Sequence, residues 1–378
     1  MDPITFAIAS LQNPLLDALG RFLDVYSPFL FLSLALLIYV FYEKVRSNRM
    51  RILSFFVALI LVLAIVMLLK QIPVPRPCIE SISLLKLGSC PIDSSFPSLH
   101  TAFGFVFAAA SLGTSFFPVF FILAVLTGLS RILVGVHTIT DVTAGVAIGL
   151  SAYFAVVALV RAYLPSFVPK TEKFKEEKAK KAGAVLEIRR DVAHALFGTS
   201  MVVIALMLGV PAAEVILLCC LFIGMVCIQL RIKKAPIPII DHLFDVLERP
   251  GVMPAMGAFT YVVGALLALS FLPAMQACAV IAALAWGDSS ATVFGTLFGK
   301  TKWFHNKKKS IIGTVSFMLF GGIAANLIIG PIGFLLAAIL ATVETVDSKI
   351  DDNLLIPVVG VLFFIALNSL AASGFALL

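Results

Sequence analysis

The chain has 378 residues, of which 61% are hydrophobic and only 13% are charged. Soluble proteins carry about 25% charged residues, so this composition excludes an ordinary soluble enzyme and predicts a polytopic membrane protein. At about 20 residues a span, roughly twelve transmembrane helices fit the chain. The net charge of +7 is typical of basic loops that set membrane orientation, so we expect no nucleic-acid partner.

The N-terminal stretch lacks a basic segment followed by an uninterrupted apolar run, so it does not resemble a cleaved signal peptide. Apolar residues recur at helical spacing from Ile4 to Phe22, which predicts an interfacial helix. Twelve apolar stretches follow and predict an all-α fold of two helical bundles. These stretches are 26–42, 52–69, 99–115, 117–136, 140–161, 193–210, 212–230, 253–271, 274–287, 310–328, 329–344 and 354–376.

A charged segment separates the fifth and sixth apolar stretches. Its mixture of Lys and Glu contrasts with the sequence on both sides, so we predict a domain at 1–165, a basic linker at 166–187 and a domain at 188–378. The linker and the hairpin at 43–51 are rich in Lys and Arg, which predicts that both are cytoplasmic. By alternation of spans, the polar clusters of the first domain face away from the cytoplasm and those of the second face into it.

Three polar clusters interrupt the apolar pattern of the first domain, and the alternation of spans brings them to one membrane face. They are Lys70 with Arg76, Ser98 with His100, and Arg131 with His137 and Asp141. Arginine offers a planar fork of donors and lysine a point charge, so these cations and the hydroxyl suit a tetrahedral phosphate. The clusters therefore predict a phosphate site.

The two histidines of these clusters supply the chemistry. His137 and Asp141 are four residues apart, so the carboxylate can hold one ring nitrogen and leave the other free to attack phosphorus. His100 can then protonate the leaving oxygen. Each residue alone has a simpler interpretation, since cations at the ends of spans anchor helices and a buried His–Asp pair can be structural. Together they favour a phosphatase.

These clusters resemble the three motifs of the type 2 phosphatidic acid phosphatase superfamily, KxxxxxxRP, PSGH and SRxxxxxHxxxD, over about residues 50–160. The third motif matches in full, whereas the first is one residue short and Leu99 replaces the usual glycine of the second. The resemblance implies that His137 forms a phosphohistidine, that Asp141 orients it and that His100 is the acid. It also implies a phosphate site that needs no metal, formed by Lys70, Arg76, Ser98 and Arg131.

The second domain gathers acids and lysines at the expected inner ends of its spans. Asp288, Glu344 and Asp352 offer hard oxygen ligands for magnesium. Lysines at 300–309 can offset the charge of a nucleoside triphosphate, although a simple basic cytoplasmic loop remains the alternative. The sequence GTLFGKT in this region is not a Walker A loop, because it has one residue too few between its glycines.

This domain resembles the CTP-dependent lipid kinases, which include dolichol kinase, yeast-type diacylglycerol kinase and phytol kinase. The resemblance covers nearly all of 188–376 and rests on RRDVAHALFG, ERPGVMPAMGAFTYVVG, GDSSATVFGTLFGKTKW, NKKKSIIGTVSF and VETVDSKIDDNLLIP. It implies magnesium binding by Asp288, Glu344 and Asp352. It implies a nucleotide site formed by Arg190, His194, Lys300, Lys307, Lys308, Lys309 and Asn353.

The two resemblances together predict a bifunctional, multi-pass membrane enzyme, with an outward-facing lipid phosphatase and an inward-facing, magnesium-dependent lipid kinase. The expected partners are a lipid phosphate or diphosphate, a lipid alcohol, CTP and membrane lipids. Salvage of polyprenol or dolichol phosphate avoids a futile cycle, because the phosphatase would act on the diphosphate and the kinase on the alcohol. Interconversion of diacylglycerol and phosphatidate is the alternative, and a lipid transporter is a third hypothesis. The sequence leaves the oligomeric state open.

Four of the six cysteines lie in apolar stretches, where cysteine acts as a small hydrophobic residue. Cys78 and Cys90 instead share a loop that the charge pattern puts outside the cytoplasm. A disulfide there would stabilise the fold by about 3 kcal/mol in the loop-entropy model. Both the bridged and the free state remain open.

Overall fold

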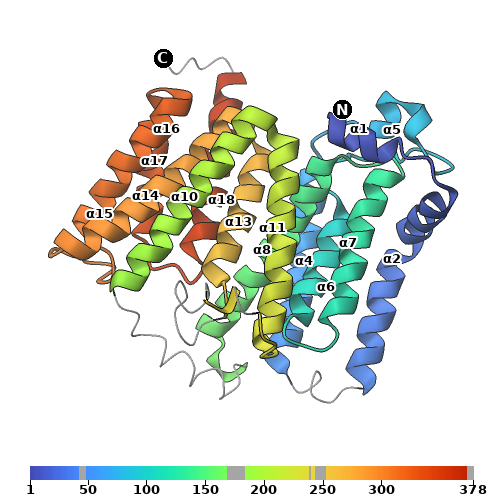
Figure 1. The fold of residues 1–378 in the computed structure, drawn as a ribbon, viewed down its shortest axis with the longest axis horizontal. Helices are drawn as coiled ribbons and strands as arrows, with labels where there is room; N and C mark the ends of the chain where they lie inside the picture. Colours follow the sequence, from blue (N-terminus) through green and yellow to red (C-terminus); the bar gives the residue numbers. More distant parts are fainter. Residues whose placement is uncertain (42–47, 168–183, 238–239, 243–252, 373–378) are drawn as a thin grey trace. The chain divides into compact units, whose positions relative to one another are not determined.

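A computed structural model shows an all-helical chain (Figure 1). The structure describes residues 1–41, 48–167, 184–237, 240–242 and 253–372. Most of the predicted basic linker, at 168–183, lies outside these residues, as do 42–47 of the first basic hairpin and 243–252. Eight described helices are long and apolar enough to cross a membrane. The chain is therefore a polytopic membrane protein, as its composition predicts.

Twelve spans are expected, and the described residues supply eight long apolar helices and four shorter ones in the corresponding places. The long ones are α2 (Pro14–Phe41), α4 (Arg49–Leu69), α8 (Ile139–Tyr163), α10 (Ala184–Leu208), α11 (Val210–Ile232), α14 (Ala274–Phe298), α18 (Asp352–Ala372) and the segment Ile311–Ile329. The shorter ones are α6 (Leu99–Ser111), α7 (Phe117–Leu133), α13 (Met256–Phe271) and α17 (Ile332–Glu344). Short connecting helices are α5 (Pro77–Glu80), η1 (Ile82–Leu84) and η2 (Pro165–Phe167).

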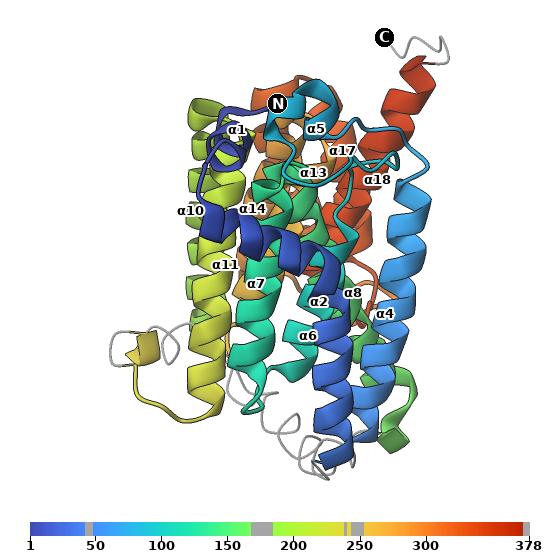
Figure 2. The ribbon, with the colours of Figure 1, turned by 90° about the vertical axis from the view of Figure 1, so that its right-hand side faces the viewer.

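The N-terminal region forms a short helix, α1 (Pro3–Ala9), before α2. The carboxylate of Asp2 caps α1 by accepting the backbone N–H of Thr5 at 2.8 Å. Figure 2 shows that α2 changes direction along its length, and Pro28 lies within it. Proline removes one helical hydrogen bond and is a common cause of such a bend. The predicted interfacial helix is thus divided between α1 and the first turns of α2.

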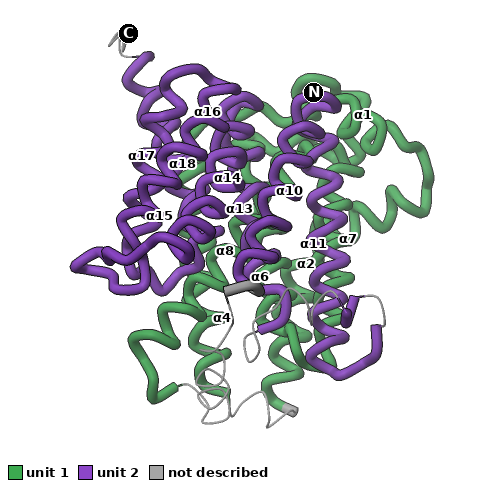
Figure 3. Tube along the Cα trace, turned by 60° about the vertical axis from the view of Figure 1, so that its left-hand side comes forward, with its two compact units in different colours: residues 1–173 green, residues 174–378 purple. Residues whose placement is uncertain are grey.

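The chain divides into two compact units, unit 1 (Met1–Lys173) and unit 2 (Phe174–Leu378) (Figure 3). In unit 1, α6 packs against α7 and α8, α4 packs against α6 and α8, and α2 packs against α7. The close contact of α6 with α8 depends on Gly149, because a Cβ there would come within 2.4 Å of the carbonyl oxygen of Ala102. Small residues let helix backbones approach in this way within a membrane.

In unit 2, α14 is the central helix. It packs against α10, α13, α17 and α18 and against the segment formed by α15 (Ile311–Ser316), the π-helical turn η3 (Phe317–Gly321) and α16 (Gly322–Ile329). Gly287 makes room for the neighbouring segment, since a Cβ there would lie 2.6 Å from the Phe317 ring. Every residue from Ala277 to Ala285 of this helix is apolar and buried, so this part of α14 is enclosed by its neighbours.

The prediction that the ninth span ends near 287 is wrong, because α14 continues to Phe298. Ser289 and Ser290 do not stop the helix, since their hydroxyls bond to the carbonyls of Ala285 and Gly287 at 2.7 and 2.8 Å. Such bonds to the preceding turn satisfy a hydroxyl inside a helix. Asp288 therefore lies within α14 rather than in a loop.

The sixth span also begins earlier than expected, since α10 starts at Ala184 rather than near 193. Its first turns carry Arg190, Asp191 and His194. Residues three apart lie on neighbouring positions of one helix face. Asp191 and His194 are therefore brought together by the helix itself.

We expect Gly149→Ala to lower the thermal stability of the protein, because the new methyl group would collide with the Ala102 carbonyl. Overpacking of this kind costs about 1–3 kcal/mol. Thermal unfolding in detergent measures the effect. Gly88→Ala is the matched control, since nothing lies within 4 Å of a Cβ at that position. Equal unfolding temperatures for the two variants would contradict the close approach of α6 and α8.

Candidate functional site

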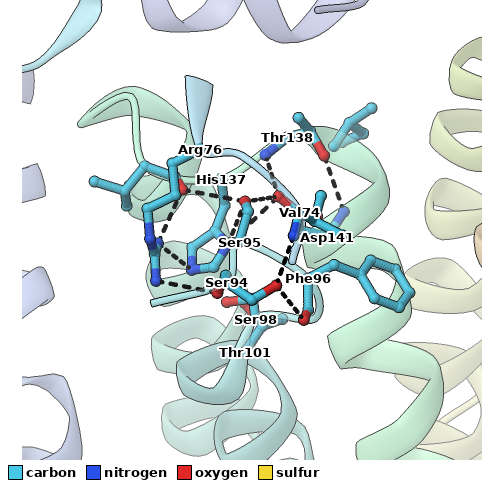
Figure 4. Close-up of polar contacts among 12 residues, drawn as sticks. Val74, Arg76, Ser94, Ser95, Phe96, Ser98, Thr101, His137, Thr138 and Asp141 are labelled. Atoms are coloured by element: carbon cyan, nitrogen blue, oxygen red, sulfur yellow. Dashed lines mark hydrogen bonds and ion pairs between the residues drawn. The ribbon is translucent and has the colours of Figure 1, made fainter. Parts of the chain in front are cut away.

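The three sequence clusters of unit 1 meet through three connecting segments, 70–76 after α4, 93–98 before α6 and 134–138 between α7 and α8 (Figure 4). The backbone N–H of Ser95 bonds to the carbonyl of Val74 at 2.9 Å, and that of Ser98 bonds to the carbonyl of Asp141 at 3.0 Å. These backbone bonds fix the segments to one another before any side chain is considered.

The start of α8 fixes Asp141 through local sequence. Thr138 is the N-cap, and its hydroxyl accepts the N–H of Asp141 at 3.2 Å. The Asp141 carboxylate in turn accepts the N–H of Thr138 at 2.8 Å. This reciprocal capping box satisfies two backbone donors at the helix start. It also holds the carboxylate one turn from His137.

His137 and Asp141 form a buried pair, as the sequence predicts. The distance from Nδ1 of His137 to Oδ2 of Asp141 is 3.4 Å. On the other side of the ring, Nη1 of Arg76 lies 3.3 Å from Nε2. Because a guanidinium can only donate, these contacts assign the ring proton to Nδ1 and a lone pair to Nε2. Nε2 is thus the nitrogen that can act as a nucleophile.

The surroundings of His137 keep its ring neutral. Burial lowers the pKa of His137, and the Arg131 and Arg76 guanidinium groups lower it further, which outweighs the effect of Asp141. A protonated imidazole has no lone pair at Nε2, so a lowered pKa preserves the nucleophilic form at neutral pH.

Ser95 contacts both residues of the His137–Asp141 pair, and the sequence did not predict it as a site residue. Its fully buried hydroxyl lies 2.5 Å from Oδ2 of Asp141 and 3.5 Å from Nδ1 of His137. The hydroxyl donates to the carboxylate and thereby helps to hold it in place. The signal in the sequence was the polar run Asp93-Ser94-Ser95, which lies shortly before the cluster of Ser98 and His100.

Asp93, also missed, occupies the two cations that the resemblance assigns to phosphate. Lys70 Nζ lies 2.6 Å from its Oδ2, and Arg76 Nη2 lies 2.7 Å from its Oδ1. Partial burial acts to raise the pKa of Asp93, but the bonds from Lys70 and Arg76 outweigh it and lower the pKa to about 2. The carboxylate side chain is 54% exposed. A phosphate entering from solvent would therefore compete with Asp93 for these donors.

The remaining predicted site residues of unit 1 are Arg131, Ser98 and His100. Arg131 is buried, and its guanidinium pairs with Asp24 of α2, while its carbonyl accepts the N–H groups of Val136 and His137, each at 3.2 Å. Ser98 is buried, and its hydroxyl accepts a bond from Thr101 at 3.0 Å. His100, at the second position of α6, lies within electrostatic reach of Lys70 and Arg76.

Cys78 and Cys90 form a disulfide, with Cα atoms 6.0 Å apart. Cys78 is buried against Val134 and Val136, which directly precede His137. The bridge therefore joins the segment after Arg76 to the loop at Cys90, and both cysteines pack against the segment that carries the histidine. Gly135 permits this packing, since its φ is 78° and a Cβ there would lie 2.4 Å from the carbonyl of Leu84.

Unit 2 contains a cavity of about 1290 Å³, whose lining is partly apolar and partly charged. Pockets for small ligands usually have volumes of about 300–1,000 Å³, so there is room for a large substrate. The predicted site residues that line it are Arg190, His194, Asp288, Lys308, Lys309, Glu344, Asp352 and Asn353. Lys300 and Lys307 are exposed and are not among the described lining residues.

Two of the three acids predicted to bind magnesium instead hold a lysine. Lys309 Nζ lies 2.5 Å from Oε1 of Glu344 and 2.9 Å from Oδ2 of Asp352. Burial acts to lower the pKa of Lys309, but these two carboxylates outweigh it and raise the pKa above its ordinary value, so the lysine stays charged. The third acid, Asp288, lies instead with Asp191 and His194.

The buried His137 is thus held by the Asp141 carboxylate on one side of its ring and by Arg76 on the other. Residues 51–164 match the model of the PAP2 superfamily. The chain therefore carries a PAP2 superfamily domain over this stretch, and this family implies a lipid phosphatase that acts on lipid phosphates. The match does not extend into 188–376, and the comparisons do not support a CTP-dependent kinase domain there. No curated protein and no solved structure matches the chain.

We expect Ser95→Ala to lower the kcat for phosphate release from a lipid phosphate by about 10- to 100-fold. The reason is the lost hydrogen bond to the Asp141 carboxylate, since bonds to charged groups contribute about 1.5–3 kcal/mol. Ser83→Ala, at an exposed serine of the same unit, is the matched control. A kcat that is the same in both variants would contradict a role for Ser95 in holding Asp141.

Proposed function

We propose that unit 1 is a lipid phosphatase in which His137 is the nucleophile. The observation that carries the proposal is the position of its ring, with Nδ1 3.4 Å from the Asp141 carboxylate and Nε2 3.3 Å from Arg76. In the first step Nε2 attacks phosphorus, and the bond from phosphorus to the lipid oxygen breaks. His100 donates a proton to that oxygen, so that an alcohol or a monophosphate leaves rather than an unprotonated alkoxide.

In the second step a water molecule attacks the phosphohistidine and transfers a proton to His100. Inorganic phosphate leaves, and both histidines return to their starting states. Arg76 and Lys70 would offset the charge on the phosphoryl oxygens once they release Asp93. Ser98 and Arg131 complete the proposed phosphate site, and the resemblance requires no metal for these steps.

We propose a polyprenyl or dolichyl diphosphate as the substrate and the side away from the cytoplasm as the location of this site. The support for the location is the concentration of Lys and Arg in the hairpin and the linker on the opposite side of the spans. Phosphatidate is the alternative substrate, because the same phosphate chemistry serves both lipids.

His137→Ala should abolish release of phosphate, by at least about 10³-fold, because loss of a nucleophile costs hydrolases this much or more. The assay offers polyprenyl diphosphate and phosphatidate to purified protein in detergent. Brief exposure of the unmodified protein to labelled substrate should also give an acid-labile phosphoprotein that the variant lacks. His242→Ala, at an exposed histidine of unit 2, serves as the control. Full activity of the His137 variant would refute the proposal.

For unit 2 we propose a CTP-dependent lipid kinase that phosphorylates a lipid alcohol and uses magnesium. The observation that favours it is the cavity, which combines apolar residues such as Phe197 and Val262 with Arg190, Lys308 and Lys309. An apolar part suits a lipid, and the cations suit phosphates. Asp288 offers a carboxylate for the metal, whereas Glu344 and Asp352 are held by Lys309. Magnesium, when bound, would offset the charge of the transferring phosphate.

In this kinase, Lys309 would bind the phosphates of the nucleotide, and Asn353, which lines the same cavity, would also contact the nucleotide. Asn353 is fastened to α13 by its amide, which donates to the carbonyl of Gly257 at 3.3 Å, while its Oδ1 has no partner among the described residues. The two proposed reactions together would supply one pool of lipid monophosphate, from a diphosphate on one side of the membrane and an alcohol on the other.

The unmodified protein should transfer phosphate from labelled CTP, in preference to ATP, to at least one of dolichol, phytol and diacylglycerol. Lys309→Gln should lower the transfer at least about tenfold, because a charge-assisted contact to phosphate is lost. The matched control is Lys349→Gln, since Lys349 is an exposed lysine that pairs with Asp347. No transfer with any pair of substrates would contradict the kinase proposal and leave the phosphatase proposal intact.

A further inference from the structure

Three potential metal ligands meet between two helices of unit 2. Asp191 and His194 lie on α10 and Asp288 lies on α14, and one donor atom of each lies within 4.8 Å of the other two. The two helices are fixed at this point by Ser289, whose hydroxyl is 2.7 Å from the carbonyls of both Asp191 and Ala285. The cluster is therefore held by packed helices rather than by a loop.

Two of the three ligand side chains have buried atoms without a well-formed hydrogen bond among the described residues. Asp191 is fully buried, and its Oδ1 accepts bonds from Arg190 at 3.0 and 3.1 Å, while its Oδ2 lacks such a bond, although Thr292 interacts with this carboxylate. His194 is 8% exposed, and its Nδ1 also lacks a partner within the described part of the chain. Leaving such groups unsatisfied costs about 1–3 kcal/mol each. A cation bound to both atoms would remove that cost.

Charge and access favour a cation as well. Asp191 and Asp288 offer two carboxyl groups to a cation, and Arg190 is the basic side chain that contacts Asp191 within the described residues. His194 and Asp288 line the large cavity, so an ion can reach the cluster from it. The ring of His194 is kept in place by stacking on Tyr261, with ring centroids 5.1 Å apart.

The separations suit one ion after a small adjustment. Two ligands about 2.2 Å from the same ion lie at most about 4.4 Å apart. The observed limit of 4.8 Å is within reach of a modest side-chain rotation. Two carboxylates with one imidazole suit manganese or zinc better than magnesium, which prefers oxygen ligands alone.

We propose that Asp191, His194 and Asp288 bind a divalent transition-metal ion, with manganese as its probe, and leave open positions toward the cavity. This set shares only Asp288 with the ligands expected from the sequence, because Glu344 and Asp352 hold Lys309. A role for the ion in phosphoryl transfer rests on the kinase proposed above. The binding itself does not, because it can be measured without nucleotide or lipid.

The experiment titrates Mn²⁺ into the purified full-length protein in detergent, with free Mn²⁺ measured by electron paramagnetic resonance. One ion per chain should bind and raise the unfolding temperature. Asp191→Asn and His194→Gln should each weaken binding at least about tenfold, since changes even beyond the ligands themselves cost 10–100-fold. Asp347→Asn is the matched control and should not change the Kd, because this exposed carboxylate pairs with Lys308 and Lys349 and is not among the described ligands of the cluster.

Absence of Mn²⁺ binding, or equal binding in the Asp191 and His194 variants, would overturn the proposal. Binding that is lost in Glu344→Gln but kept in Asp191→Asn would also overturn it, since the ion would then lie at the Lys309 cluster. Asp288→Asn is the third ligand variant and should also weaken Mn²⁺ binding; its position is half-buried, so this change is less prone to unfold the protein, and circular dichroism checks the fold of each variant. Metal binding without transfer from CTP would support this site and contradict the kinase instead.

Discussion

The Asp141 carboxylate is the group on which the phosphatase centre depends. It accepts bonds from the Thr138 backbone and the Ser95 hydroxyl at 2.8 and 2.5 Å, and it lies 3.4 Å from the His137 ring. One side chain thus caps α8, anchors the segment before α6 and contacts the proposed nucleophile. Because the segments 93–98 and 134–138 both meet at this acceptor, a small displacement of Asp141 would misplace both of them. The disulfide next to Val136 restrains the same region from the other side.

Several cations of the predicted sites form ion pairs with acidic side chains of the same unit. Lys70 and Arg76 bind Asp93, Arg131 binds Asp24, and Lys309 binds Glu344 and Asp352. An unpaired charge near a membrane is costly, so cations that await a phosphate need a provisional partner. Substrate affinity then reflects an exchange of one anion for another. The Asp93 side chain is more exposed than that of Asp24, so a phosphate can displace Asp93 more easily. This difference favours Lys70 and Arg76 as the first groups to bind a phosphate.

The predicted sites of the two units are built from different groups. Unit 1 offers a nucleophilic ring and cations at a site built from loop segments, and its phosphatase class rests on the PAP2 match as well as on geometry. Unit 2 offers a large cavity whose charged residues project from helices α10 and α14 and from the connections near Lys309 and Asp352. Its proposed kinase activity rests on the cavity and on resemblance. The proposed metal ion would link α10 to α14, since Asp191 and His194 lie on α10 and Asp288 lies on α14.

The sequence by itself determined the membrane class, the helical fold and the pairing of His137 with Asp141. These follow from composition, from apolar stretches and from a four-residue spacing, all of which act within a short length of chain. Only the tertiary structure decided which acid meets which cation. Ser95 meets Asp141 across 46 positions, Asp93 meets Lys70 across 23, and Asp191 lies beside Asp288 although 97 positions separate them. Such contacts depend on how helices pack. For the same reason, polar residues of α10 and α14 that were expected at span ends lie inside these helices and close together.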